Sequence, residues 1–265
     1  RLQPAERFLG GYLVGRGFFC SETGGRAVRR NRTVRDGMLR NRVLKLAHEH
    51  PELRKHLVPL LCKQAVALGV GEEDPRNPRV TGHAIVYNAK VTGNASVSGN
   101  AQVFNYAQVG DNASVSGNAE VSNGAYVLDN ARVSDRVQVT GRVVVFGHAK
   151  VSDDAKVSDH SAVSGNARVS DKAQISDKAH VSDNARVSGN ARVSGYATVY
   201  DSARVFGDAF VTEVASIFGN ATVSGNTVIK GKVRVGGTAV IRGGIWEGLG
   251  KITEGTWDGP GKRVK

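Results

Sequence analysis

A six-residue repeat constrains the fold of this chain more than any other feature of its sequence. Over residues 91–240 the chain runs in steps of six without insertion, which makes 25 consecutive hexads. The first position is Val in all hexads except those that begin at Ile175, Ile217 and Ile229, and the fifth is Ala in 20 of the 25. Self-similarity at a short fixed period is typical of solenoids, in which each repeat stacks on its neighbours.

Each preferred residue type has a physical reason. A β-branched first residue suits a strand side chain that points into a narrow core, and a fifth-position Ala suits a crowded corner. The third position is Gly, Asn or Asp in all hexads but the one with Glu213, and these residues tolerate the left-handed backbone of a tight corner. Stacked coils of such units can bury a continuous core, with strands about 4.8 Å apart. The repeat therefore predicts an all-β solenoid.

The Val-Ser-Gly-Asn-Ala pattern, seen for example at residues 97–101, resembles the hexapeptide repeat of left-handed β-helix proteins and is most similar to the YdcK-like β-solenoid family. The resemblance covers residues 80–242. It implies a left-handed triangular coil with three hexads per turn, so that residues 18 apart lie above one another. Such solenoids include acyltransferases, γ-class carbonic anhydrases and non-enzymatic structural proteins, so the resemblance indicates the fold and not the function.

The remaining segments differ from the repeat in composition. Residues 1–35 mix short apolar runs with a basic run and are expected to be irregular. Residues 36–69 place apolar side chains at helical spacing, with Pro51 where a second helix would begin, and predict a helical hairpin. Residues 70–79 are expected to form a linker into a β-helix over residues 80–243. Trp246 and Trp257 lie in a Gly-rich stretch, so residues 244–265 predict a cap over the last coil and a basic tail.

Three hexads per turn would sort the outward side chains into three faces, and one of these carries no charge from Tyr126 to Phe218. An exposed apolar strip of this length exceeds what a monomer usually shows, so we expect it to be covered. Self-association would cover it, with a homotrimer implied by the family resemblance, and so would the tail or the N-terminal segment of the chain itself. The candidate self-association residues are Tyr126, Leu128, Val144, Phe146, His180, Tyr200 and Phe218.

A second face carries five cations in one column. Like charges at strand spacing repel one another, so the column requires either an anionic partner or nearby acids. Asp135, Asp153 and Asp171 follow the first three cations by three positions, which favours a solvated, salt-bridged face over an anionic partner. The column, which we name the cation ladder, consists of Arg132, Lys150, Arg168, Arg186 and Arg204.

Positive charge is concentrated near the N-terminus. The chain has 36 Lys and Arg against 24 Asp and Glu, a net charge of +12, and residues 1–79 alone hold 16 basic and 8 acidic side chains. The basic run over residues 26–45 could neutralise phosphates, but few aromatic residues interleave, so base stacking is not expected. Nucleic acid is therefore favoured less than an acidic protein surface or plain solvation. The candidate contacts in this run are Arg26, Arg29, Arg30, Arg32 and Arg35.

The evidence for an active site is weak. Hexapeptide acyltransferases typically use a His at a subunit interface and loops that leave the coil, whereas the 25 hexads here have no insertion. His180 is the best catalytic candidate because it lies on the apolar face, but its own column supplies no carboxylate to orient it. The His pair of the γ-class carbonic anhydrases is absent, and Cys20 and Cys62 lack zinc-ligand spacing, so no metal or other cofactor is expected.

These features favour a non-enzymatic structural or interaction protein. We expect a rigid rod of about nine coils and roughly 40 Å that attaches to a larger assembly through residues 1–69, by analogy with decoration or fibre proteins of phage and virus particles. The alternatives are an acyltransferase acting on a small acceptor at a trimer interface, and polyanion or nucleic-acid binding through residues 26–45. The chain has no membrane-length apolar run and opens on Arg-Leu-Gln-Pro without a signal-peptide core, so the cytoplasm or a virion is the expected location.

Overall fold

The computed structural model describes residues 79–261, 263 and 264, which lie in the second of two compact units, Cys62–Lys265. Every regular element in this part of the chain is a β-strand. No helix with the length and apolar character needed to cross a membrane occurs among these residues. The helical hairpin expected over residues 36–69, the basic run over residues 26–45, and both Cys20 and Cys62 lie outside the described residues.

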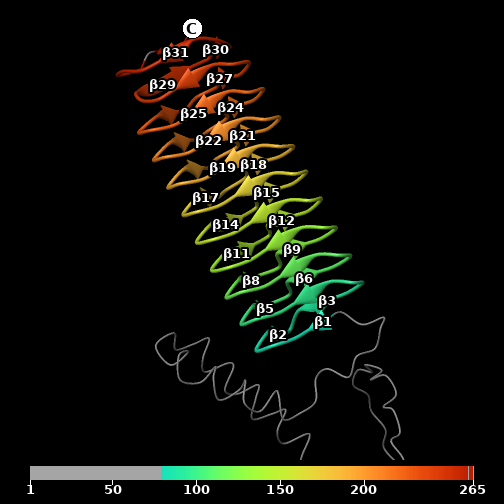
Figure 1. The fold of residues 1–265 in the computed structure, drawn as a ribbon. Coiled ribbons are helices and arrows are strands. Elements are labelled where there is room, and N and C mark those ends of the chain that lie inside the picture. The colour runs from blue at the N-terminus through green and yellow to red at the C-terminus, as the bar shows by residue number, and fades with distance from the viewer. Residues whose placement is uncertain (1–78, 262, 265) are drawn as a thin grey trace, which may run out of the picture. The chain divides into compact units, whose positions relative to one another are not determined.

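The strands form three parallel sheets that we name A, B and C (Figure 1). Sheet A consists of β1 (Arg79–Val80), β4 (Ser96–Val97), β7 (Ser114–Val115), β10 (Arg132–Val133), β13 (Lys150–Val151), β16 (Arg168–Val169), β19 (Arg186–Val187), β22 (Arg204–Val205), β25 (Thr222–Val223), β28 (Val240–Ile241) and β31 (Thr256–Trp257). Sheet B consists of β2 (Ile85–Tyr87), β5 (Gln102–Phe104), β8 (Glu120–Ser122), β11 (Gln138–Gly141), β14 (Lys156–Asp159), β17 (Gln174–Ile175), β20 (Arg192–Val193), β23 (Phe210–Val211), β26 (Val228–Ile229), β29 (Ile245–Gly248) and β32 (Arg263–Val264). Sheet C consists of β3 (Lys90–Val91), β6 (Gln108–Val109), β9 (Tyr126–Val127), β12 (Val144–Val145), β15 (Ala162–Val163), β18 (His180–Val181), β21 (Thr198–Val199), β24 (Ser216–Ile217), β27 (Arg234–Val235) and β30 (Lys251–Ile252).

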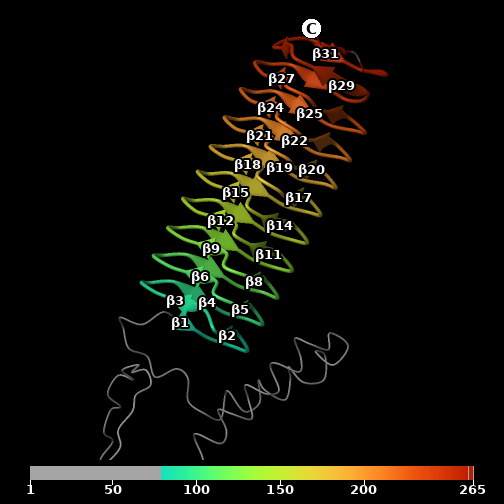
Figure 2. The same ribbon diagram turned by 180° about the vertical axis from the view of Figure 1, so that it is seen from behind.

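The register of the strands confirms the all-β solenoid with three hexads per turn. Val133 pairs with Val151, and Val151 with Val169, so equivalent residues of successive coils are 18 apart. Each coil contributes one strand to each sheet, and the three sheets enclose the core between them (Figures 1 and 2). The described residues make about ten turns, with 11, 11 and 10 strands in the three sheets, rather than the nine expected.

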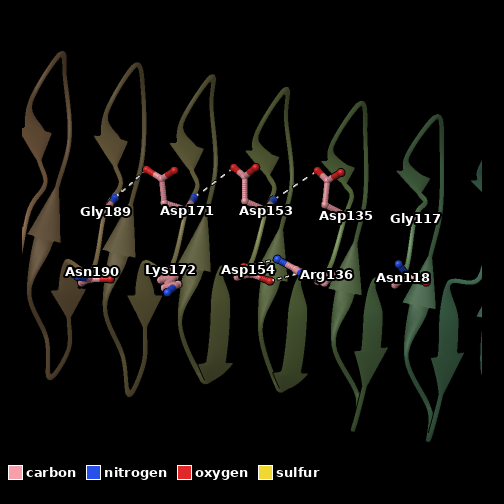
Figure 3. Close-up of a pocket in the computed structure, with 10 residues that line it drawn as sticks. All are labelled: Gly117, Asn118, Asp135, Arg136, Asp153, Asp154, Asp171, Lys172, Gly189 and Asn190. Atoms are coloured by element: carbon pink, nitrogen blue, oxygen red, sulfur yellow. Dashed lines mark hydrogen bonds and ion pairs between the residues drawn. The ribbon is translucent and has the colours of Figure 1, made fainter.

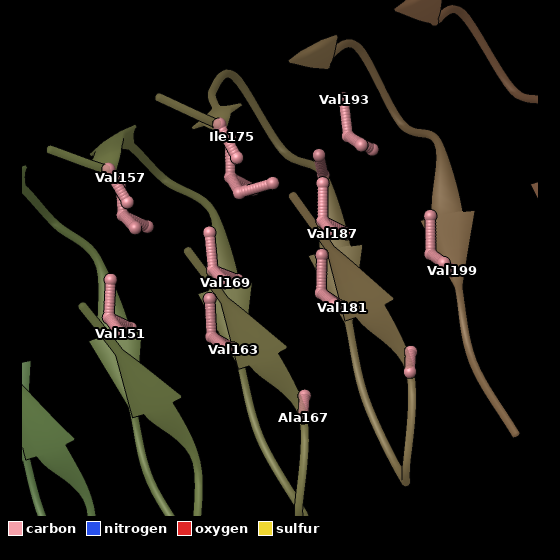
Figure 4. Close-up of a cluster of buried hydrophobic side chains, with 14 of the residues drawn as sticks. Val151, Val157, Val163, Ala167, Val169, Ile175, Val181, Val187, Val193 and Val199 are labelled. Carbon is pink, nitrogen blue, oxygen red and sulfur yellow. The ribbon is translucent and has the colours of Figure 1, made fainter. Parts of the chain in front are cut away.

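The core consists of the first and fifth positions of the hexads. Val151, Val169 and Val187 follow one another along one side, and Val163, Ile175 and their equivalents fill the other two (Figure 4). These side chains are fully buried or nearly so. Burial of many β-branched side chains between only three narrow sheets makes the core continuous from coil to coil.

Two polar residues at the fifth position of the hexad form hydrogen bonds to the backbone three residues earlier. Buried Ser161 and Thr227 replace the usual Ala. The Ser161 hydroxyl donates to the Ser158 carbonyl at 2.7 Å, and the Thr227 hydroxyl donates to the Ser224 carbonyl at 2.5 Å. A buried hydroxyl without a partner would cost stability, so each of these corners closes on its own backbone.

The third position of the hexad has the left-handed backbone that its composition predicted. Asp153 has φ +64°, and even Glu213, the exception in the sequence, has φ +61°. At Gly117 a Cβ would approach the backbone of Asp135 in the next coil to between 2.7 and 2.9 Å. Glycine at such a corner avoids both the torsional strain of a positive φ and a steric clash between a Cβ and the backbone of the next coil.

The Gly-rich C-terminal segment continues the coil with fewer residues per turn. Trp246 pairs with Ile229 and Trp257 with Ile241, so spacings of 17 and 16 replace 18. Trp246 is 4% exposed and packs edge-to-face on Trp257, with ring centroids 5.5 Å apart. The Trp246 indole N–H donates to the Gly243 carbonyl at 2.8 Å. The two large side chains thus fill core positions at the end of the solenoid, and this extra strand pairing accounts for the additional turn.

Candidate interaction surfaces

The cation ladder occurs in register on sheet A. Arg132 pairs with Lys150, Lys150 with Arg168, Arg168 with Arg186 and Arg186 with Arg204. All five side chains are exposed. Consecutive cations are therefore one strand spacing apart, about 4.8 Å at the backbone. The sequence-based prediction of this column is confirmed in its geometry.

The ion pairs expected between the cation ladder and the acids that follow it are not formed. Asp135, Asp153 and Asp171 lie at the corner between sheets A and B, where each carboxylate accepts the backbone N–H of the equivalent residue in the next coil (Figure 3). The Asp153 carboxylate also accepts the hydroxyl of Ser152 at 2.9 Å. No ion pair joins any cation of the ladder to an acid within the described part of the chain. The carboxylates are directed at the corner backbone rather than at the ladder because that N–H has no carbonyl partner.

A shallow groove follows this corner beside the cation ladder (Figure 3). Arg136 and Asp154 form an ion pair across it, with the guanidinium Nε 2.6 Å from a carboxylate oxygen. Lys172 and Asn190 line the groove in the following coils. The exposed ion pair contributes little stability, but it neutralises the two groups locally.

The same carboxylate arrangement occurs at the other two corners. At the corner between sheets B and C, the Ser158 hydroxyl donates to the Asp159 carboxylate at 2.7 Å and the Asp177 backbone N–H donates to it at 3.2 Å. These two donors lower the pKa of the Asp159 carboxyl below its ordinary value because they stabilise its ionised form. At the corner between sheets C and A, the carboxylates of Asp183 and Asp201 likewise accept the backbone N–H of the equivalent residue in the next coil.

The apolar strip on sheet C divides into two patches. Near the N-terminal end, Tyr126 and Phe146 are 36% and 39% exposed, with half-buried Val144 and Leu128 beside them. Ala162, Ser164 and Ser182, together with His180, make the middle of the strip small or polar. The strip is therefore interrupted rather than continuously apolar, and the patch around Phe146 is its most exposed part.

The second patch on sheet C is partly covered by cations from the following coils. Tyr200 and Phe218 stack with ring centroids 5.5 Å apart. The Arg234 guanidinium lies 5.2 Å and the Lys251 ammonium 5.5 Å from the Phe218 ring centroid. A Cβ at Gly236 would overlap the Phe218 ring, so Gly236 provides the space into which this ring leans. Cation–π contact reduces the apolar surface that this patch presents.

His180 is exposed on sheet C between Ala162 and Thr198. No carboxylate or other polar side chain is hydrogen-bonded to it among the residues described. An imidazole without an orienting partner is a poor general base, because neither its tautomer nor its direction is fixed. The described residues also contain no group of three or more His, Cys, Asp or Glu side chains arranged to hold a metal ion.

Two surface features were not predicted from the sequence. Phe210, Val228 and Ile245 follow one another on sheet B, and Phe210 and Ile245 are exposed. A shallow pocket near the N-terminal coils is lined by Tyr106, Tyr126, Arg142 and neighbouring amides, with Tyr106 73% exposed. The apolar column on sheet B follows from the 18-residue spacing of outward-facing residues. The pocket does not, because its lining depends on how the corners bend.

Comparisons with known proteins identify the repeat. The YdcK β-solenoid repeat model matches residues 179–195, 185–201 and 215–231, so the chain carries YdcK β-solenoid repeats. Among solved structures it is similar to UDP-N-acetylglucosamine acyltransferase from Campylobacter jejuni, at 18% identity and a TM-score of 0.35, over 63% of this chain and 67% of that chain. A likeness at this level does not indicate a shared activity. No curated protein matches the sequence.

Proposed function

We propose that this chain, whose solenoid carries YdcK β-solenoid repeats, is a non-enzymatic structural module. In this proposal it forms a rigid rod that self-associates as a homotrimer through sheet C. Residues 1–69 attach it to a larger assembly, such as a phage or virus particle. The uninterrupted register of the three sheets supports a rod, because no segment over residues 91–240 leaves the coil to build a substrate pocket.

The observation that carries the self-association is the exposed patch around Tyr126 and Phe146. These rings present apolar surface on a flat sheet, together with Val144, which pairs with Tyr126 and is two residues before Phe146. A second copy of this chain is the occupant we favour, because its sheet C has the same coil spacing and the same uncharged side chains. Aromatic residues at the centre of an interface contribute much of its binding energy.

Light scattering on the full chain at micromolar concentration tests this proposal. We expect a mass of three chains for the wild type. Phe146→Lys would place a charge in the interface and is expected to weaken association by more than about 30-fold, because an aromatic anchor contributes about 2 kcal/mol or more.

Gln138→Lys is the matched control, since it adds the same side chain at an exposed position of sheet B in the same coil. It should leave the mass unchanged. A monomeric wild type, or equal behaviour of the two variants, would overturn the self-association. Acyl transfer from an acyl-CoA that is lost in His180→Ala would overturn the non-enzymatic proposal.

Attachment through the N-terminal segment has a separate test. The full chain purified from its source should elute with a large complex. Substitution of Arg26, Arg29, Arg30, Arg32 and Arg35 by Gln should release it, because the basic run would supply the contacts to an acidic surface. Elution of both proteins at the mass of the free oligomer would contradict attachment through this run.

A further inference from the structure

We propose that the cation ladder on sheet A binds a linear acidic polysaccharide, one whose sugar rings carry carboxylate or sulfate groups. The ladder consists of Arg132, Lys150, Arg168, Arg186 and Arg204, and it spans four strand steps, roughly 19 Å along the solenoid. This proposal concerns a different face from the proposed self-association and does not rest on it.

The cations of the ladder form no ion pair with an acid among the described residues, which leaves their charges open to an external anion. Consecutive side chains such as Lys150 and Arg168 start from directly paired backbone positions. Like charges on paired strands destabilise a sheet unless another charge compensates them. Acids at the adjoining corner, such as Asp153, are hydrogen-bonded to the corner backbone and to a serine hydroxyl instead. An anionic chain lying along the ladder would meet one cation at each coil.

The residues that flank the ladder favour a single-stranded polymer over a double helix as the ligand. Asp135, Asp153 and Asp171 form a row of carboxylates along one corner of sheet A. The opposite corner carries further carboxylates, including Asp183 and Asp201. A double helix has two dense rows of phosphates and would meet these carboxylates, whereas a single extended polymer fits between the corners.

The side chains beside the ladder favour sugars over bases. Ser134, Ser152, Ser170 and Ser188 form the column beside the ladder. The Ser134 and Ser152 hydroxyls donate to Asp135 and Asp153 and can still accept a hydrogen bond from a saccharide hydroxyl, whereas those of Ser170 and Ser188 can donate as well as accept. Single-stranded nucleic acids are typically held by aromatic platforms on which bases stack. Along the ladder, the four coils from Arg132 to Arg186 present no aromatic side chain on sheet A, and the coil of Arg204 adds one exposed ring, that of Phe206, which cannot stack successive bases. Guanidinium groups also pair with carboxylate and sulfate through two parallel hydrogen bonds.

Calorimetry on the full chain tests this proposal with three probes. These are an oligogalacturonate, a heparin-type sulfated oligosaccharide, and a single-stranded oligonucleotide with the same number of charges. We expect at least one of the two saccharides to bind more tightly than the oligonucleotide. The two saccharides distinguish carboxylate from sulfate as the preferred group.

Two triple variants distinguish the ladder from net charge. Lys150→Gln, Arg168→Gln and Arg186→Gln together remove the centre of the ladder and should weaken saccharide binding about tenfold or more. They should also flatten its salt dependence, because fewer counterions are exchanged. The control combines Lys156→Gln, Arg192→Gln and Lys232→Gln, which remove three exposed cations elsewhere on the solenoid and should change binding less than about twofold.

Several results would overturn the proposal. Equal weakening by the two triple variants would assign binding to net charge. Binding that survives loss of the ladder would assign it to the basic N-terminal run. Tighter binding of the oligonucleotide would indicate nucleic acid as the partner, and no binding of any probe would leave the ladder without a ligand of this class. Because these measurements leave sheet C unchanged, their failure is distinguishable from failure of the trimer.

Discussion

The carboxylate of Asp153 accepts the backbone N–H of Asp171, its counterpart one coil further along the solenoid, at 3.2 Å. The same contact links Asp135 to Asp153 and Asp171 to Gly189, so a chain of carboxylates connects four coils (Figure 3). The backbone N–H at this position of the hexad has no carbonyl partner in the neighbouring coil, unlike those before and after it. The acidic corner residues therefore complete the hydrogen bonding between coils where the strands end.

Asp153→Gly isolates this contact. Glycine tolerates the φ of +64° at this position, so the variant removes the acceptor without adding torsional strain. We expect the Asp171 amide to exchange about tenfold faster, which corresponds to about 1.4 kcal/mol for a charge-assisted hydrogen bond. Hydrogen exchange followed by NMR measures this. The Ser170 amide, which donates to the Val187 carbonyl at 3.0 Å, should keep its protection.

Asp154→Asn is the control for this variant. Asp154 neighbours Asp153 but pairs with Arg136 across the groove. Asp154→Asn should not change the hydrogen-exchange rate of the Asp171 amide. If both variants accelerate exchange equally, the effect arises from lost charge and not from the carboxylate contact.

The lowered pKa of Asp159 predicts a loss of stability in acid. Its ionised form is favoured in the folded chain, first by the Ser158 hydroxyl and then by the Asp177 backbone N–H. The resulting stabilisation is complete above the ordinary Asp value of 3.8 and is lost as the pH falls through the lower pKa of the folded state. In Ser158→Ala we expect the pKa of Asp159 to move towards 3.8, as measured by NMR titration of the carboxyl carbon.

Ser164→Ala is the matched control for the titration. It removes a serine hydroxyl at the same position of the hexad, but the next residue there is Gly165 and not an acid. It should leave the pKa of Asp159 where it is in the wild type. An unchanged pKa in Ser158→Ala would mean that the hydroxyl is not the main cause of the shift.

Gly236→Ala should disrupt the aromatic stack on sheet C. The new methyl group would overlap the Phe218 ring, which packs over this glycine and stacks on Tyr200. Overpacking of this kind typically costs about 1–3 kcal/mol. We expect the ring-current shifts between Phe218 and Tyr200 to be lost in NMR spectra, and Phe218→Ser in the same chain to restore the stability.

Gly110→Ala provides the comparison. There a Cβ would meet the Leu128 and Thr92 side chains at 3.1 Å, which small rotations can relieve. Its cost should be smaller than that of Gly236→Ala. The reverse order would mean that backbone strain, rather than the Phe218 ring, limits substitution on this column.

Trp246→Ala should open the C-terminal end of the core. The variant removes a nearly buried indole, its contact with Trp257 and its hydrogen bond to Gly243. Truncation of a buried Trp typically costs about 3–5 kcal/mol. Because each coil contacts only its neighbours, we expect faster hydrogen exchange in the last coils and unchanged exchange near Val97. Uniform destabilisation of all coils would contradict this local response.

The sequence was sufficient to predict the architecture because core and corner residues recur with one period. Val151 and Val169 were expected to stack at a spacing of 18, and they are paired in sheet A. The alignment of Lys150 with Arg168 follows from the same period. The period of six determines which side chains enter the core, because a shift by a number of residues that is not a multiple of six would expose the Val residues. The three hexads per turn were implied by the family resemblance, since the Val core alone would accept any whole number of hexads.

The contacts of individual side chains could not be predicted in the same way. The spacing placed Asp153 near Lys150, but it did not reveal the unpaired N–H of Asp171 that competes for the carboxylate. The uncharged run ends at Phe218, and the spacing alone does not show that Arg234 and Lys251 of the following coils lie over its ring. Trp246 was expected in a cap, but the shortened last turns place it in register with Ile229 within the core.

The 18-residue turn also constrains how such a protein can change length during evolution. Gain or loss of one whole coil, for example between Val151 and Val169, would leave every downstream side chain on its original face. Gain or loss of a single hexad would be accepted equally well by the core, but it would rotate all downstream residues by one face. Arg186 and Arg204 would then leave the line of Arg132, while the Val core remained intact. Duplication in units of three hexads is therefore the route by which the rod could lengthen and keep its surfaces aligned.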